Sequence, residues 1–99
     1  MPTFVTLYRF TGQGVRTVKD SPARVEAAIK AATQAGGNVK AVYVTLGQYD
    51  LVAISEWPND EMAASAILAQ ASLGNVSTET LRAFTQDEFK QIVAKMPST

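Results

Sequence analysis

The chain of 99 residues contains no cysteine and no histidine. These two absences exclude disulfide bridges, thiolate nucleophiles, catalytic triads built on histidine, histidine-ligated haem and the usual zinc sites. An excess of charge of either sign is also lacking, because nine basic and nine acidic side chains cancel. We therefore expect no binding to nucleic acid and none to an anionic membrane surface. No apolar run approaches the roughly 20 residues that a membrane span requires.

The composition that remains is ordinary for a globular domain, with 46% hydrophobic and 18% charged residues. No internal repeat or low-complexity tract divides the chain, so we expect one domain over residues 1–99. Its first residues, Met1 to Phe4, lack the basic segment of a targeting signal. We expect a cytoplasmic protein that carries no cofactor and no metal.

Strands are predicted where β-branched and aromatic residues alternate. The second and third of them are separated by a tight connection and should form an antiparallel hairpin. The expected strands are Thr3–Phe10, Val39–Leu46, Asp50–Trp57 and Val76–Phe84.

Helices are predicted from apolar spacing and from their terminal residues. One begins at Ser21 and ends at Gly36-Gly37, and a second covers Asp60–Leu73 with Asn59 as its cap. A last helix is capped by Thr85, with Glu88 as the capping-box partner. The segment Gly12-Gln13-Gly14 is interpreted as a flexible loop, because it lacks the lysine of a phosphate-binding loop.

The resulting order is βαββαβ with a C-terminal helix. This is the ferredoxin-like α+β arrangement, a four-stranded antiparallel sheet with two helices on one face. Right-handed crossovers would place both helices on the same side.

Alternation divides the strand residues between two faces of this sheet. A purely aliphatic set is assigned to the helix-covered core, and a set rich in aromatic and hydroxyl side chains to the open face. The first set is Val5, Leu7, Val42, Val44, Val52, Ile54 and Leu81. The second is Phe4, Thr6, Tyr8, Phe10, Tyr43, Thr45, Leu51, Ala53, Ser55 and Trp57, with Thr78, Thr80 and Arg82.

Both faces are too apolar for solvent, while two helices cover only one, so we expect a homodimer or a higher homo-oligomer. The open face could pack directly against a second subunit. Alternatively, the space between the sheets could hold a small apolar ligand. The lining residues would then be Tyr8, Tyr43, Ser55, Trp57 and Arg82.

Three segments together resemble the GYD domain family. They are VYVTLGQYDLVAISEWPND (residues 42–60), LGNVSTETLRAF (residues 73–84) and SPARVEAAIKAA (residues 21–32), and Gly47, Tyr49 and Asp50 match the residues that give the family its name. The resemblance implies a dimeric α/β barrel in which two ferredoxin-like sheets face each other. It implies no particular biochemical activity.

Tyr49 and Asp50 have two interpretations. A phenol and a carboxylate at one end of the sheet could relay a proton or line a ligand site. Equally, glycine and aspartate are the residues that tight turns require. Arg82 is similar, since it could pair with a substrate carboxylate or form a cross-strand ion pair, while Glu79 falls on the opposite face of the same strand.

Three classes of function follow. The first is an oligomeric module that binds a small molecule or serves as an accessory to other proteins. The second is a cofactor-free enzyme of the monooxygenase or isomerase type, and the third is a purely structural assembly subunit.

Overall fold

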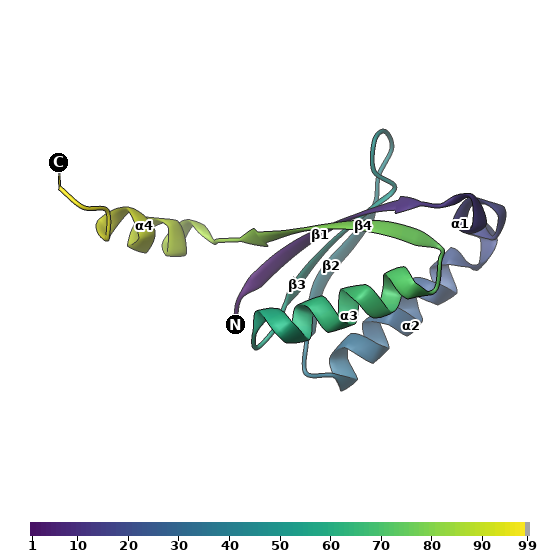
Figure 1. Cartoon of the computed structure of the whole chain (residues 1–99), viewed down its shortest axis with the longest axis horizontal. Coiled ribbons are helices and arrows are strands. Elements are labelled where there is room, and N and C mark those ends of the chain that lie inside the picture. Colours follow the sequence, from purple (N-terminus) through teal and green to yellow (C-terminus); the bar gives the residue numbers. More distant parts are fainter. Residues whose placement is uncertain (99) are drawn as a thin grey trace.

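The computed structural model describes residues 1–98 and has the predicted order of strands and main helices, with a short helix and a 3-10 turn added after the first strand (Figure 1). The strands run antiparallel in the order β2-β3-β1-β4, which is the ferredoxin-like topology. The helices α2 and α3 cover the same face of the sheet. The strands are β1 (Thr3–Phe10), β2 (Asn38–Val44), β3 (Leu51–Glu56) and β4 (Val76–Ala83). The helices are α1 (Gly12–Arg16), the 3-10 turn η1 (Val18–Asp20), α2 (Ser21–Gln34), α3 (Asp60–Ser72) and α4 (Gln86–Ala94).

The predicted helix caps of α3 and α4 are confirmed. The Asn59 side chain accepts a hydrogen bond from the Met62 backbone at 2.9 Å. At α4, the Thr85 hydroxyl accepts a hydrogen bond from the Glu88 backbone N–H at 3.1 Å. The Glu88 carboxylate in turn accepts one from the Thr85 backbone N–H at 2.9 Å. The hydrogen bond from the Thr85 backbone holds the pKa of Glu88 below its ordinary value. Both helices therefore begin where their local sequence directs.

The segment after β1 is helical, so its interpretation as a flexible loop is wrong. Thr11 accepts a hydrogen bond from the Gly14 backbone at 3.1 Å, which starts α1. The Thr11 backbone also donates to the Asn75 carbonyl at 3.0 Å. Gly14 is buried against Asn75, where a Cβ atom would lie 2.0 Å from the carbonyl oxygen. Position 14 requires glycine because the backbone of α1 approaches the backbone at Asn75 closely. These contacts hold the short helix against the start of β4.

The assignment of the sheet faces is reversed for β1, β3 and β4. The helix-covered face carries the aromatic and hydroxyl set, including Phe4 and Trp57, which form a core cluster with Ala32 and Ala63 of the helices. Alanines on α2 and α3 bring these helices close to the sheet and leave room for large rings below them. The buried strand residues are Phe4, Thr6, Leu51, Ala53 and Ser55.

Only β2 faces as predicted. A bulge between Val39 and Ala41 shifts its register, which places Val42 on the helix side and Tyr43 on the open side, opposite Val52. Tyr43 is 61% exposed. The aliphatic residues of the other strands, assigned to the core from the sequence, lie on the open face instead.

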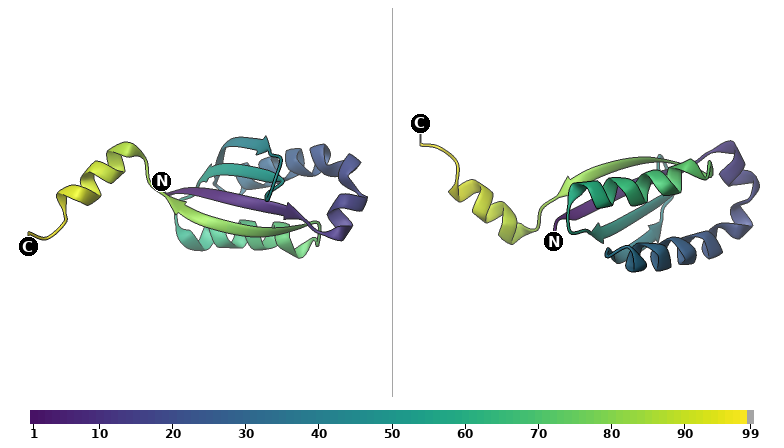
Figure 2. Two further views of the ribbon diagram at one scale, coloured as in Figure 1. Left: turned by 90° about the horizontal axis from the view of Figure 1, so that it is seen from above. Right: turned by 60° about the horizontal axis from the view of Figure 1, so that its bottom comes forward.

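The helix α4 projects away from the sheet and from the other helices (Figures 1 and 2). The radius of gyration is consequently 15.3 Å, against about 13 Å for a compact chain of this length. The apolar side chains of α4 and of the turn that follows it recur at the spacing of one helix face, and they are between 42% and 66% exposed. This stripe consists of Phe89, Ile92 and Val93 of α4, and it is continued by Met96, two residues beyond the helix end at Ala94.

Among residues 1–98, no helix has both the length and the apolar character needed to cross a membrane. Within the same range, acidic side chains do not gather in the groups of three or more that could hold a metal ion.

Candidate functional site

A cavity of about 450 Å³ lies between the helices and the sheet. α2 and α3 form its walls, and β1, β2 and β3 form its floor. Tyr8 and Trp57 belong to the lining, and most of the other lining side chains are aliphatic. Burial raises the pKa of the Tyr8 hydroxyl above its ordinary value. A molecule bound here would meet an apolar surface with a few polar groups, which is the usual character of a ligand site.

The opposite face of the sheet is open and aliphatic. Val5 of β1 lies between Ile54 of β3 and Leu81 of β4, so that these residues form one row across the sheet. Leu7 and Val52 continue the apolar surface in the next row. No helix of the described chain covers this face. Exposed apolar patches of this kind are commonly buried against a partner protein or a ligand.

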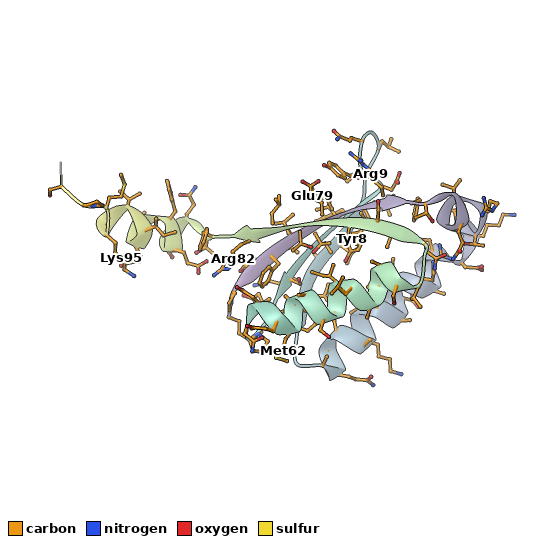
Figure 3. All side chains as sticks on the ribbon, in the orientation of Figure 1. Tyr8, Arg9, Met62, Glu79, Arg82 and Lys95 are labelled. Atoms are coloured by element: carbon orange, nitrogen blue, oxygen red, sulfur yellow. The ribbon has the colours of Figure 1, made fainter. Side chains whose placement is uncertain are left out.

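A polar cluster stands at one edge of this open face. The Tyr49 hydroxyl donates to the Glu79 carboxylate at 2.7 Å, and the Arg9 guanidinium lies 4.8 Å from the centre of the Tyr49 ring. The hydrogen bond to Glu79 raises the pKa of the Tyr49 phenol. Figure 3 shows Arg9 and Glu79 on the side of the sheet away from the helices, and Tyr8 on the helix side. The cluster borders the aliphatic surface rather than the cavity.

Asp50 fastens the β2–β3 connection to β1. Its carboxylate accepts a hydrogen bond from the Phe10 backbone at 2.8 Å, and its own backbone donates to the Tyr8 carbonyl at 2.8 Å. Gly47, in the same connection, has a φ of +119°, which an L side chain rarely adopts. These contacts support the turn interpretation of Gly47 and Asp50.

We expect Asp50→Ala to lower the free energy of unfolding by about 1–3 kcal/mol, because the partly buried Phe10 N–H would lose its acceptor. Urea unfolding followed by tryptophan fluorescence measures this change. Tyr49→Phe is the matched control, since it removes only the exposed hydrogen bond to Glu79 and should cost less than about 1 kcal/mol. An equal loss in the two variants would contradict the structural role of Asp50.

Arg82 lies at the base of α4. Its guanidinium sits 4.5 Å from the centre of the Phe84 ring and 5.7 Å from that of Phe4. It also donates to the carbonyls of Thr3 and Ala83. Neither a ligand pocket nor an ion pair is needed to explain its position, because cation–π contacts and backbone acceptors already hold it.

The residues expected to form one site are therefore distributed over several places. Tyr8 and Trp57 line the cavity, and Ser55 accepts a hydrogen bond from the Trp57 indole at 3.1 Å. Tyr43 is on the open face. Tyr49 and Asp50 lie in the β2–β3 connection, and Arg82 lies at the end of β4.

Sequence reasoning missed the contribution of the helices to the cavity. Arg24 and Val25 of α2 and Met62 and Gln70 of α3 all line it. The available signal was the alanine content of both helices, because small side chains on facing helices leave space above a sheet that carries large rings.

Comparisons with known proteins agree with the fold and with the resemblance seen in the sequence. The GYD domain family model matches residues 4–93. A Thermus thermophilus protein named "Glutamine synthetase and cystathionine beta-lyase binding protein" is 38% identical over 84 residues, which cover 84% of this chain and 88% of that protein. The crystal structure of TTHA0845 from Thermus thermophilus is similar, with a TM-score of 0.56 and 32% identity over 86% of this chain and 95% of that one.

Proposed function

The chain belongs to the GYD domain family, and from this membership we propose that it is a self-associating accessory protein that binds a metabolic enzyme. Glutamine synthetase is the first partner to test, because the Thermus thermophilus relative is named for binding that enzyme and cystathionine beta-lyase. The observation that carries the proposal is the presence of two separate exposed apolar surfaces, the open sheet face and the stripe on α4.

The sheet face is suited to a second copy of the chain. It is broad and aliphatic, and it presents the row of Val5, Ile54 and Leu81. Two such faces packed together would bury these side chains between two sheets, as the dimeric α/β barrel implied by the family resemblance requires. The cluster of Tyr49, Glu79 and Arg9 would then lie at the rim of the contact.

The α4 stripe is suited to the enzyme. Phe89, Ile92 and Val93 occupy positions i, i+3 and i+4 of α4, and Met96 follows at i+7, just beyond the helix end. This is the pattern of a helix that lies in an apolar groove of its partner. The helix stands clear of its own sheet, so that this stripe is presented to another molecule (Figure 1).

The test measures binding of the purified protein to glutamine synthetase from the same organism by biolayer interferometry. We expect saturable binding that Ile92→Lys weakens at least about tenfold, because a lysine in the centre of the stripe would have to be desolvated. Gln91→Lys is the matched control, since it adds the same charge to α4 outside the stripe. Absence of binding by the unchanged protein would contradict the proposed partner, and equal binding by both variants would contradict the assignment to α4.

A further inference from the structure

We propose that the cavity beneath α2 and α3 binds a small anionic amphiphile, a molecule with a carboxylate at one end and a short aliphatic chain. The cavity volume of about 450 Å³ lies within the range of roughly 300–1,000 Å³ that is usual for small-molecule sites. This inference does not depend on the proposed partner enzyme, because the cavity lies on the helix-covered side of the sheet.

The expected charge of the ligand follows from Arg24. Its Nη1 donates to the carbonyl and to the hydroxyl oxygen of Thr17, both at 3.1 Å. Its Nη2 is buried and has no hydrogen-bond partner among the described residues. A buried guanidinium N–H without an acceptor is costly, and a carboxylate is the acceptor that fits the guanidinium plane best.

No acidic side chain of residues 1–98 supplies this acceptor. Arg24 is the single charged residue among those described residues that line the cavity. The ion pair found in this range joins Lys40 to Glu56, on β2 and β3. The cavity is therefore lined by one half-buried positive charge with no acidic partner in the described chain, in an otherwise largely apolar surface. This arrangement favours an anion over a neutral or a cationic molecule.

Polar lining groups gather at the same end of the cavity as Arg24. This end is formed by the start of α2, the end of α3 and the end of β1. The Tyr8 hydroxyl is a donor available to a bound carboxylate, and the amides of Gln70 and Asn75 belong to the same part of the lining.

The other end of the cavity is apolar. α2 extends from Arg24 to Ala32 over about 12 Å, given the rise of about 1.5 Å per residue. The chain then returns at Gly37, where a Cβ atom would lie 2.7 Å from the Trp57 indole. Trp57, Met62 and Ala32 therefore surround the end of the cavity remote from Arg24. A short aliphatic chain would lie along this axis with its carboxylate at Arg24.

Trp57 is the only tryptophan of the chain and provides the readout. We expect octanoate, titrated into the unchanged protein, to change the fluorescence of Trp57 saturably. Octan-1-ol, which has the same chain length without the charge, should bind at least about tenfold more weakly, because it cannot pair with Arg24.

Two variants test the site. Arg24→Gln should weaken octanoate binding at least about tenfold and leave octan-1-ol binding unchanged, whereas Arg16→Gln, which removes an exposed positive charge on α1, should change neither. Ala66→Leu should narrow the cavity and weaken the binding of both molecules in a protein that still folds, as circular dichroism would verify.

Three results would overturn the proposal: no saturable change with octanoate, equal affinity for octanoate and octan-1-ol, or unchanged octanoate binding by both Arg24→Gln and Ala66→Leu. None of these results bears on the binding of glutamine synthetase, which is measured separately and through α4.

Discussion

Val5→Lys is expected to convert the proposed homodimer into monomers that remain folded. Val5 lies at the centre of the open sheet face, between Ile54 and Leu81. In the monomer a lysine at this position would point into solvent and cost little. In a symmetric dimer the same substitution occurs twice, and each ammonium group would lose its hydration without gaining a partner.

The expected magnitude follows from that desolvation. Two buried, unpaired ammonium groups cost several kcal/mol each, and every 1.4 kcal/mol or so is a factor of ten in affinity, so the dissociation constant should rise at least about 1,000-fold. Sedimentation velocity and native mass spectrometry measure the change. Val44→Lys is the matched control. Val44 is a strand valine on the helix side of the sheet, and its side chain is 77% exposed, so this substitution should leave the dimer intact. A Val5→Lys protein that stays dimeric would locate self-association elsewhere.

Gly14→Ala is expected to lower the free energy of unfolding by about 2–4 kcal/mol, the range of severe steric substitutions. The new methyl group would lie 2.0 Å from the carbonyl oxygen of Asn75, so α1 and the start of β4 would have to separate. That movement would also strain the hydrogen bond from Thr11 to the same carbonyl. The melting temperature should fall by roughly 10 °C or more in a domain of this size.

Gly12→Ala provides the control in the same short helix. Its Cβ atom would lie 3.2 Å from the end of the Arg16 side chain, which can move aside. We expect this variant to be neutral or stabilised by up to about 1 kcal/mol, because alanine loses less backbone entropy than glycine in a helix. Similar melting temperatures for the Gly12→Ala and Gly14→Ala proteins would show that the contact with Asn75 is unimportant. Thermal unfolding followed by circular dichroism distinguishes the outcomes.

The order and approximate bounds of the main elements could be predicted from the sequence because local signals determine them. Asn59 caps α3 and the pair Thr85 and Glu88 caps α4, in agreement with the positions expected from the sequence alone. The glycines after β1 were less informative about secondary structure. Gly12 and Gly14 suggested a loop, but the Thr11 side chain and the contact with Asn75 make the segment helical.

The covered face of the sheet could not be predicted from residue type, because both faces are apolar. Which face of the sheet is covered depends on the size of the side chains that the helices direct toward the sheet. Alanines such as Ala32 and Ala63 leave space for Phe4 and Trp57, so the aromatic face is covered and the aliphatic face is open. For the same reason, the contribution of Arg24 to the cavity depends on tertiary packing and has no local sequence signature.

The isolation of α4 has a consequence for the kinetics of amide hydrogen exchange. A helix of nine residues is too short to be stable in water without contacts to other elements, whatever the quality of its cap. Its backbone amides should therefore exchange rapidly in the free chain and slowly once the stripe is docked. Part of the interaction energy would be spent on ordering this segment, which lowers affinity and speeds release without reducing the contact area. A partner held through α4 would be bound reversibly, and the exchange rates of these amides would report its occupancy.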